Sequence, residues 1–316
     1  MKGEERVIYL DNNATTRTAP EAVAAMLPYF SEYYGNASSI HKFGGRLAKV
    51  VEEGRAKVAA FLGADPSEII FTSCGTEGDN AAILSALDVC PKRRRKIVIS
   101  TVEHPAILNL GKDLERRGYT VVKIPVDSLG RLDMDRAREM IDEQTAVVSV
   151  MWANNETGNL YPVEALAELA HRAGALFHTD AVQAAGKIPF KLRDDLHNRL
   201  IAAIPSVRVN GDVEHRLPNT TNLSFEYIEG ESILMHMDIH GICASSGSAC
   251  TTGSLEPSHV MRAMGVPYTA AHGAIRFSFS RYNTQEDVDT VVEVLPGIIE
   301  KIRAISPYWA DFVAKR

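Results

Sequence analysis

The feature that most constrains this chain is a repeated alternation of short apolar runs with helical patterns between residues 69 and 179. Apolar runs typical of buried strands occur at 69–71, 97–100, 121–126, 146–151 and 176–179. Helical periodicity occupies the stretches between them, at 76–87, 105–117, 133–142 and 163–173. This alternation predicts an α/β fold with a mostly parallel sheet, in which ligands bind beyond the carboxyl ends of the strands.

The alternation ends after Lys187. Strand-like runs at 207–209 and 221–225 follow, with helical patterns at 192–203, near 230–240 and at 285–304; two further helices are predicted upstream, at 21–33 and 45–62. The later elements form an α+β pattern, which predicts a second domain. We therefore expect a large domain over residues 16–191 and a small domain formed by residues 1–15 and 192–316.

The composition excludes several classes of function. A net charge of −6 does not indicate the basic surface that binds nucleic acid, and no apolar run approaches the length of a membrane span. The four cysteines show neither a C-x-x-C pair nor a metal spacing: Cys74, Cys90, Cys243 and Cys250. Such thiols are typical of a reducing compartment, so we expect a cytoplasmic protein without a resident metal.

A phosphate site is predicted where the strand at 69–71 meets the following helix. The turn contains Gly75 and Thr76 among small and hydroxyl residues. Free N–H groups and the helix dipole at such a turn favour a phosphate. The alternative interpretation is that Thr76 only caps the helix.

Polar residues follow three other strand ends. His104 could stack on an aromatic ring, Asn155 supplies an amide, and Asp180 and Gln183 follow the strand at 176–179. A buried carboxylate such as Asp180 needs a partner, and a pyridinium nitrogen is a suitable one. Each residue also has an ordinary structural interpretation, as a cap or a core polar group. Their convergence on one edge of the sheet favours a binding site.

Two residues of the second domain complete the candidate site. Cys250 lies among small residues at 245–254, without a bulky neighbour to bury it, which favours a reactive thiol over a structural one. Arg276 interrupts the strand-like run 274–278. Its guanidinium can hold a carboxylate bidentately, or it can form a salt bridge within the domain.

With these residues assembled, the chain resembles the class V aminotransferase-fold cysteine desulfurases over residues 7–190 and 192–316. The motifs that carry the resemblance are YLDNNATT (9–16), GNASSIH (35–41), FTSCGTEGDN (71–80), EHPA (103–106), ANNETG (153–158), HTDAVQAAGK (178–187), LPNTTNLSF (217–225) and SSGSACTTGSLEPSHV (245–260). The ending AAHGAIRFSFSRYNT (270–284), with SPYW (306–309), is most similar to the nitrogen-fixation (NifS) branch.

The resemblance implies the type I fold of pyridoxal-phosphate (PLP) transferases, with a large parallel-sheet domain and a small α+β domain. It implies a homodimer that takes sulfur from L-cysteine and leaves L-alanine and an enzyme persulfide. The sulfur would pass to a scaffold protein for iron–sulfur cluster assembly, that of nitrogenase above all.

Residue roles are also implied by the resemblance. Gly75 and Thr76 would hold the cofactor phosphate, and His104 would stack on the ring and take part in catalysis. Asn155 and Gln183 would face the ring hydroxyl, and Asp180 would keep the ring nitrogen protonated.

For the substrate, the resemblance implies that Arg276, with Asn155, binds the carboxylate. Cys250 would attack the substrate sulfur and hold it as a persulfide, and it is the one residue expected to ligate an iron–sulfur cluster transiently.

The chain departs from this family after Asp180. Roughly eighty residues of the family pattern are absent, among them two central strands of the large sheet and the lysine that links covalently to PLP. Residues 187–190 run almost directly into the start of the small domain. Lys187 matches another lysine of the family and is expected to be structural, whereas Lys191 at the junction is a weak substitute.

Three functions remain open at this stage. The first is a cysteine desulfurase that lacks an internal segment, for which we expect very weak or no turnover and lowered stability. The second is a catalytically dead relative that relays sulfur through Cys250 or serves as a dimer partner. The third is another class V activity such as selenocysteine lyase, which the serine-rich loop around Cys250 disfavours.

Overall fold

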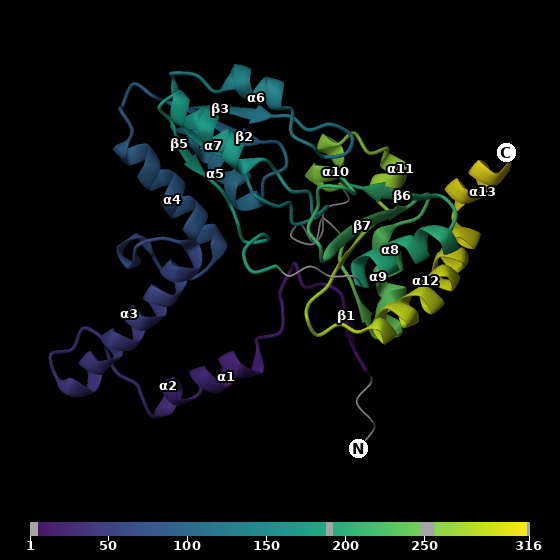
Figure 1. Ribbon diagram of the computed structural model, residues 1–316. Helices are drawn as coiled ribbons and strands as arrows, with labels where there is room; N and C mark the ends of the chain where they lie inside the picture. The colour runs from purple at the N-terminus through teal and green to yellow at the C-terminus, as the bar shows by residue number, and fades with distance from the viewer. Residues whose placement is uncertain (1–5, 188–191, 247–255, 315–316) are drawn as a thin grey trace. The chain divides into compact units, whose positions relative to one another are not determined.

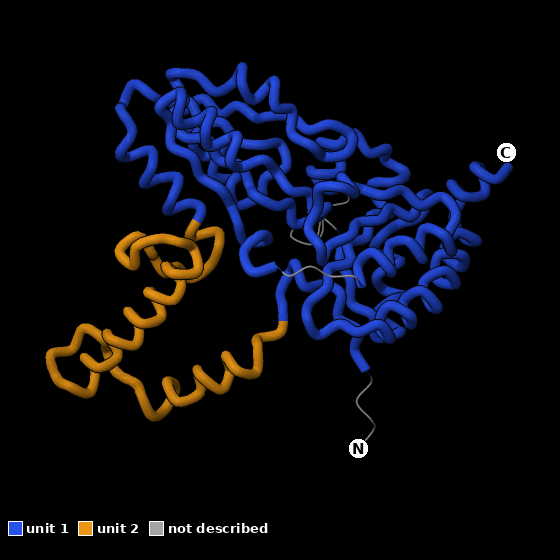
Figure 2. Tube along the Cα trace, viewed as in Figure 1, with its two compact units in different colours: residues 1–16, 79–316 blue, residues 17–78 orange. Residues whose placement is uncertain are grey.

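The computed structural model describes residues 6–187, 192–246 and 256–314. Contacts divide the chain into two compact units, the first formed by residues 1–16 and 79–316 and the second by residues 17–78 (Figure 2). The predicted division into a large domain (16–191) and a small domain (1–15 and 192–316) stays a prediction.

The first unit contains a four-stranded parallel sheet in the order β3-β2-β4-β5 (Figure 1). Its strands are β2 (Lys96–Ser100), β3 (Thr120–Ile124), β4 (Thr145–Ser149) and β5 (Leu176–His178). The helices that alternate with them are α4 (Gly75–Val89), which begins in the second unit, α5 (Pro105–Arg116), α6 (Met134–Met140) and α7 (Val163–Arg172). The predicted α/β fold with a parallel sheet is therefore confirmed.

Both faces of the central strands β2 and β4 are buried, which explains why these strands are apolar runs rather than alternating ones. Successive side chains of a strand point to opposite faces. Ile97 and Ile99 pack in a core cluster with residues of α4 and α5, whereas Val98 packs in another with residues of α6 and α7.

The remainder of the first unit is built on an antiparallel sheet in the order β6-β7-β9 (Figure 1). Its strands are β6 (Val207–Asn210), β7 (Thr220–Phe225) and β9 (Ala274–Ser278); β1 (Ile8–Tyr9) pairs with β8 (Ile242–Cys243) beside it. The helices are α8 (Leu192–Ala203), α9 (Gly230–Ile239), α10 (His259–Ala263), α11 (Tyr268–Ala271), α12 (Gln285–Ile305) and α13 (Pro307–Ala314). A core around Phe225, Phe277 and Leu295 joins α8, α9 and α12 to the sheet.

The second unit consists mainly of helices: α1 (Pro20–Met26), α2 (Pro28–Ser31), α3 (Lys42–Leu62) and the 3₁₀ turn η1 (Pro66–Glu68). The prediction of one helix over 21–33 is wrong, because the chain divides it at Pro28, which has no N–H to donate. Helix α3 ends at Gly63, whose φ of 70° suits a glycine cap.

The strand predicted at 69–71 is also wrong. Residues 69–71 belong to no strand, and the side chain of Ile70 is 82% exposed. In the implied family fold, two strands from the absent segment lie between this run and β5. In the described chain β5 pairs with β4 alone, so an apolar run suited to a strand has no neighbour to pair with.

Among the described helices, none is long and apolar enough to cross a membrane.

Candidate functional site

The turns that follow β2, β4 and β5 are bound to one another, so the predicted convergence of these strand ends is present in the first unit. The Met151 backbone N–H donates to the Glu103 carboxyl group at 3.0 Å, which joins the β2 turn to the β4 turn. The Trp152 N–H donates to the Asp180 carbonyl oxygen at 2.9 Å, which joins the β4 turn to the β5 turn. At the carboxyl edge of the sheet, the three turns are therefore joined by hydrogen bonds rather than being separate loops.

His104 lies at the start of α5, immediately after the β2 turn. Its Nδ1 accepts a hydrogen bond from the Ala106 backbone N–H at 3.2 Å, so the imidazole is the N-cap of the helix. Pro105 at the first helical position favours this geometry, since its missing N–H would have no helical partner. The structural role is thus present, and the predicted stacking role stays a prediction.

Asp180 is a buried carboxylate, 9% exposed, that follows β5. Its Oδ1 accepts a hydrogen bond from the Val182 N–H at 3.0 Å. Within the described residues it forms no salt bridge with Lys, Arg or His. Burial, with the nearby Asp180 charge, raises the pKa of the Asp79 carboxyl to about 6. A buried carboxylate without a cationic partner is costly, so a cationic group of a ligand at this strand end would stabilise it.

Near Asp180, three side chains form a polar row that the sequence did not reveal. The Ser149 hydroxyl lies 2.9 Å from Nδ1 of His178, and Nε2 of the same ring lies 3.6 Å from Asp79. Burial lowers the pKa of His178, which favours the neutral ring.

Asn13 forms hydrogen bonds with several residues of the site, and sequence reasoning gave it no role. Its side-chain N–H donates to the Asn155 carbonyl oxygen at 3.2 Å and to the Thr220 hydroxyl at 2.9 Å. Its backbone oxygen accepts from the Gln183 amide at 3.1 Å, and its side-chain oxygen accepts from the Lys187 amine at 3.2 Å. The only available signal was its place in the motif YLDNNATT (9–16), to which no role was assigned.

Arg276 on β9 belongs to the same group. Its guanidinium donates to the Asn155 carbonyl oxygen at 3.0 Å and to the Asp11 carboxylate at 2.6 Å. The side chain is 4% exposed, and its Nε has no hydrogen-bond partner among the described residues. The salt bridge foreseen as the alternative interpretation is therefore present, and one buried N–H of the guanidinium stays unpaired in this part of the chain.

The segment with Cys250 lies outside the described residues, but the chain on both sides of it is fastened to this site. Ser245 exchanges backbone hydrogen bonds with Arg276, at 3.2 and 2.7 Å. Ser258 donates its hydroxyl proton to Glu156, a buried carboxyl whose pKa is raised to about 7 by burial. Asn155, next to Glu156, bonds to Arg276.

Gly75 and Thr76 open helix α4 and belong to the second unit. The predicted N-terminal turn is present there, with the Ser73 backbone N–H and hydroxyl donating to Glu77 at 2.7 and 2.5 Å. Their predicted contact with the cofactor phosphate stays a prediction.

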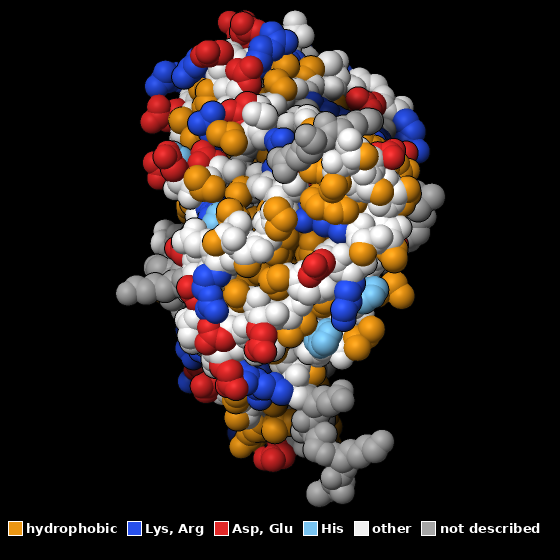
Figure 3. All heavy atoms as spheres, turned by 90° about the vertical axis from the view of Figure 1, so that its right-hand side faces the viewer, with side chains coloured by type: hydrophobic (Ala, Val, Ile, Leu, Met, Phe, Trp, Pro, Cys, Tyr) orange, Lys and Arg blue, Asp and Glu red, His pale blue; other side chains and the backbone are white. Residues whose placement is uncertain are grey.

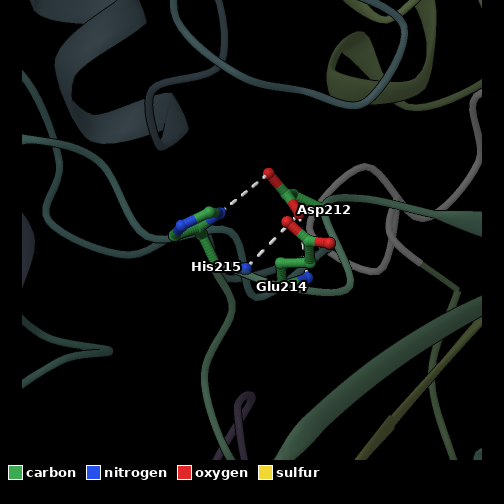
Figure 4. A group of neighbouring side chains, drawn as sticks. All are labelled: Asp212, Glu214 and His215. Carbon is green, nitrogen blue, oxygen red and sulfur yellow. Dashed lines mark hydrogen bonds and ion pairs between the residues drawn. The ribbon is translucent and has the colours of Figure 1, made fainter.

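Two other features lie outside the predicted set of site residues. Asp212, Glu214 and His215 form a small acidic group in which Asp212 accepts from the backbone N–H groups of the other two (Figure 4). These bonds are those of a turn. A cavity of about 420 Å³ lies among Tyr227, Tyr268 and the start of α13, on the side that carries α12 and α13, where hydrophobic side chains gather between charged ones (Figure 3).

Comparisons with known proteins agree on one family. The family model described as Aminotransferase class-V matches residues 8–196 and 191–291. A protein of Nostoc sp. named "Cysteine desulfurase" is 46% identical, with 96% of each chain covered. One of Azotobacter vinelandii named "Cysteine desulfurase NifS" is 44% identical, with 96% of this chain and 95% of that protein covered. A solved structure described as "NIFS-LIKE PROTEIN" superposes with a TM-score of 0.86 at 30% identity, over 94% of this chain and all of that one.

The same comparisons locate the missing segment. The alignment with the Nostoc protein runs over 384 positions, whereas this chain has 316 residues, so at least 68 aligned positions hold no residue of this chain. The two stretches matched by the family model meet at residues 191–196. The break lies at the junction where the sequence departs from the family pattern.

Proposed function

Since this chain belongs to the class V aminotransferase family, we propose that it acts as a cysteine desulfurase of the NifS type, with pyridoxal phosphate as the family's cofactor. It would take sulfur from L-cysteine and hold it as a persulfide on Cys250 for iron–sulfur cluster assembly. The observation that carries the proposal is the hydrogen-bonded group of Gln183, Asn155 and Arg276 around Asn13, directly beside the residues that flank Cys250.

The residues of the first unit fit the cofactor. Asp180 is a buried carboxylate without a cationic partner in the described chain, which suits a protonated ring nitrogen. Asn155 and Gln183 are both hydrogen-bonded to Asn13 and would face the ring hydroxyl. When bound, the cofactor withdraws electrons from the substrate carbon, and Asp180 holds the proton on the ring nitrogen that this requires.

The remaining steps fall to side chains of this chain. The free Nε–H of Arg276 would bind the substrate carboxylate, while the salt bridge to Asp11 keeps the guanidinium in place. The Cys250 thiolate would attack the substrate sulfur, so that an S–S bond forms as the C–S bond breaks. The electron pair of that bond remains with carbon, which takes up a proton and leaves as L-alanine.

The flanks of the Cys250 segment explain how a thiol can serve such a site. Ser245 is paired with Arg276 and Ser258 with Glu156, so the segment starts and ends within the group that would bind the substrate.

A second candidate function is that of a desulfurase relative without catalysis, acting as a sulfur relay or dimer partner. The aligned positions without a residue of this chain favour it, because the resemblance places the covalent lysine of the family within them. A homodimer, a scaffold protein as sulfur acceptor and a cytoplasmic location belong to the proposal. Among the described cysteines, Cys74, Cys90 and Cys243 are free thiols, as a reducing compartment favours.

The test is sulfide release from L-cysteine by the full chain with PLP and a reductant, measured beside Cys250→Ser. Sulfide release and alanine in equal amounts, both lost in C250S, are the expected result for a desulfurase. Absence of both from the wild-type chain, with a persulfide accepted by Cys250 from a sulfur donor, would favour the relay instead.

A further inference from the structure

Lys187 lies in the candidate site rather than on the surface of the turn that carries it. The turn starts at Asp180 and includes Gln183, and Lys187 follows it with a half-buried side chain. Its amine donates to the side-chain oxygen of Asn13 at 3.2 Å, and the Gln183 amide donates to the backbone oxygen of the same residue at 3.1 Å. The amine therefore shares one asparagine with the group proposed to face the ring hydroxyl.

The amine of Lys187 is bound to a neutral group rather than to a carboxylate. Burial favours the pairing of a lysine with a carboxylate, most strongly when the side chain is fully buried. Within the described residues Lys187 forms no salt bridge, and the acceptor that the structure shows is the neutral amide of Asn13. Burial, followed by the nearby positive charge of Arg276, lowers the pKa of Lys187. A desolvated lysine beside a second cation more readily loses its proton, which makes its amine a nucleophile.

The geometry points to Lys187 as the amine that links covalently to the cofactor aldehyde in this chain, in place of the lysine absent with the internal segment. This assignment rests on the proposed function. The neutral amine adds to the aldehyde carbon, a C=N bond forms, and the aldehyde oxygen leaves as water with the two protons of the amine. No oxidation or reduction takes place, and no other reactant is needed.

The test is to trap this bond and locate it. The full chain is incubated with PLP, and borohydride then supplies hydride to reduce the C=N bond to a stable amine. Peptide mass spectrometry locates the phosphopyridoxyl group. The expected result for the wild-type chain is modification of Lys187, together with a visible absorbance band from the C=N bond before reduction. Lys187→Arg keeps the charge and the side-chain length and should lose both the adduct and this band. Lys191→Arg is the matched control and keeps both signals.

Folding and cofactor binding are measured separately for each variant. Circular dichroism and thermal melting check that K187R is folded, and equilibrium dialysis measures bound PLP without reference to the covalent bond. An adduct on Lys191, an adduct spread over several lysines, or full adduct yield in K187R would overturn the assignment. Absence of any adduct in the wild-type chain would overturn it as well.

These outcomes separate the assignment from the proposed function. An adduct on Lys187 without sulfide release supports the assignment and removes the desulfurase activity. Sulfide release that persists in K187R removes the assignment and leaves the desulfurase activity standing.

Discussion

Glu103, in the turn after β2, allows a test of how burial affects the ionisation of the carboxyl groups near the strand ends. Its side chain is fully buried and accepts hydrogen bonds from the Ser100 hydroxyl at 2.6 Å and from the Met151 N–H at 3.0 Å. Burial raises the pKa of its carboxyl from 4.5 to about 8, despite these two bonds. The folded protein thus holds a proton on Glu103 at neutral pH, whereas the unfolded chain releases it.

The sign and size of the effect follow from linkage. A folded pKa above the unfolded one stabilises the folded state fully at low pH, and this contribution is lost as pH rises from 4.5 towards about 8. Within that window the free energy of unfolding falls by about 1.4 kcal/mol per pH unit, or about 2.5 kcal/mol between about pH 5 and about pH 7. Glu103→Gln, which cannot ionise, lacks this dependence.

The assay is urea denaturation of the wild-type chain and of E103Q, without PLP, at several pH values. The difference between the two proteins removes the contributions of other titrating groups, including Glu156 and Asp79. We expect E103Q to gain stability relative to the wild type as pH rises. A difference that stays flat from about pH 5 to about pH 8 would show that the hydrogen bonds keep Glu103 ionised, and the reasoning would be refuted.

Three further outcomes are expected. Burial and the charge of Arg216 lower the pKa of His197 to about 4, so the wild type should lose about 1 kcal/mol more stability than His197→Gln between about pH 7 and about pH 5, as urea denaturation will show. Arg193 is 8% exposed, its Nη1 has no hydrogen-bond partner among the described residues, and the Asp194 carboxylate that pairs with its Nε at 3.0 Å is exposed enough for water to solvate it after the substitution. Arg193→Met should therefore raise the free energy of unfolding by about 1 kcal/mol; a lower value contradicts the argument. Asp180→Asn keeps an acceptor for the Val182 N–H but loses the charge, so sulfide release should fall by about a hundredfold or more while thermal melting changes little.

The parallel sheet and its strand ends could be predicted because their signals are local. Apolar runs fully buried on two faces give β2 and β4, and the polar residues after them identify the binding edge. Asn13 could not be found in this way. It follows β1, a strand of two residues whose partner β8 lies more than two hundred positions further along the chain, and such pairing leaves no local pattern. The residues 69–71 show the reverse: their local preference suits a strand, but the described chain offers no partner.

The proposal for Lys187 illustrates a further limit of motif reasoning. Lys187 matches a lysine that the family pattern already contains, which indicated a structural role. Its contact with Asn13 and the absence of a carboxylate partner in the described chain became visible only in three dimensions. A motif states which residues are present, whereas the reactivity of an amine depends on what surrounds it.

The N-terminal segment determines when this site can exist during synthesis. The Ile8 and Leu10 N–H groups donate to the backbone beside and within β8, and Asn13 is held by the backbone N–H that it donates to the Ser278 hydroxyl. Residues 8–13 are synthesised before β8 and β9, so they wait for both strands before they reach their places. Until Ser278 has been synthesised, a nascent chain carries Gln183 and Lys187 without the asparagine that joins them, so cofactor capture is expected only after that residue has emerged.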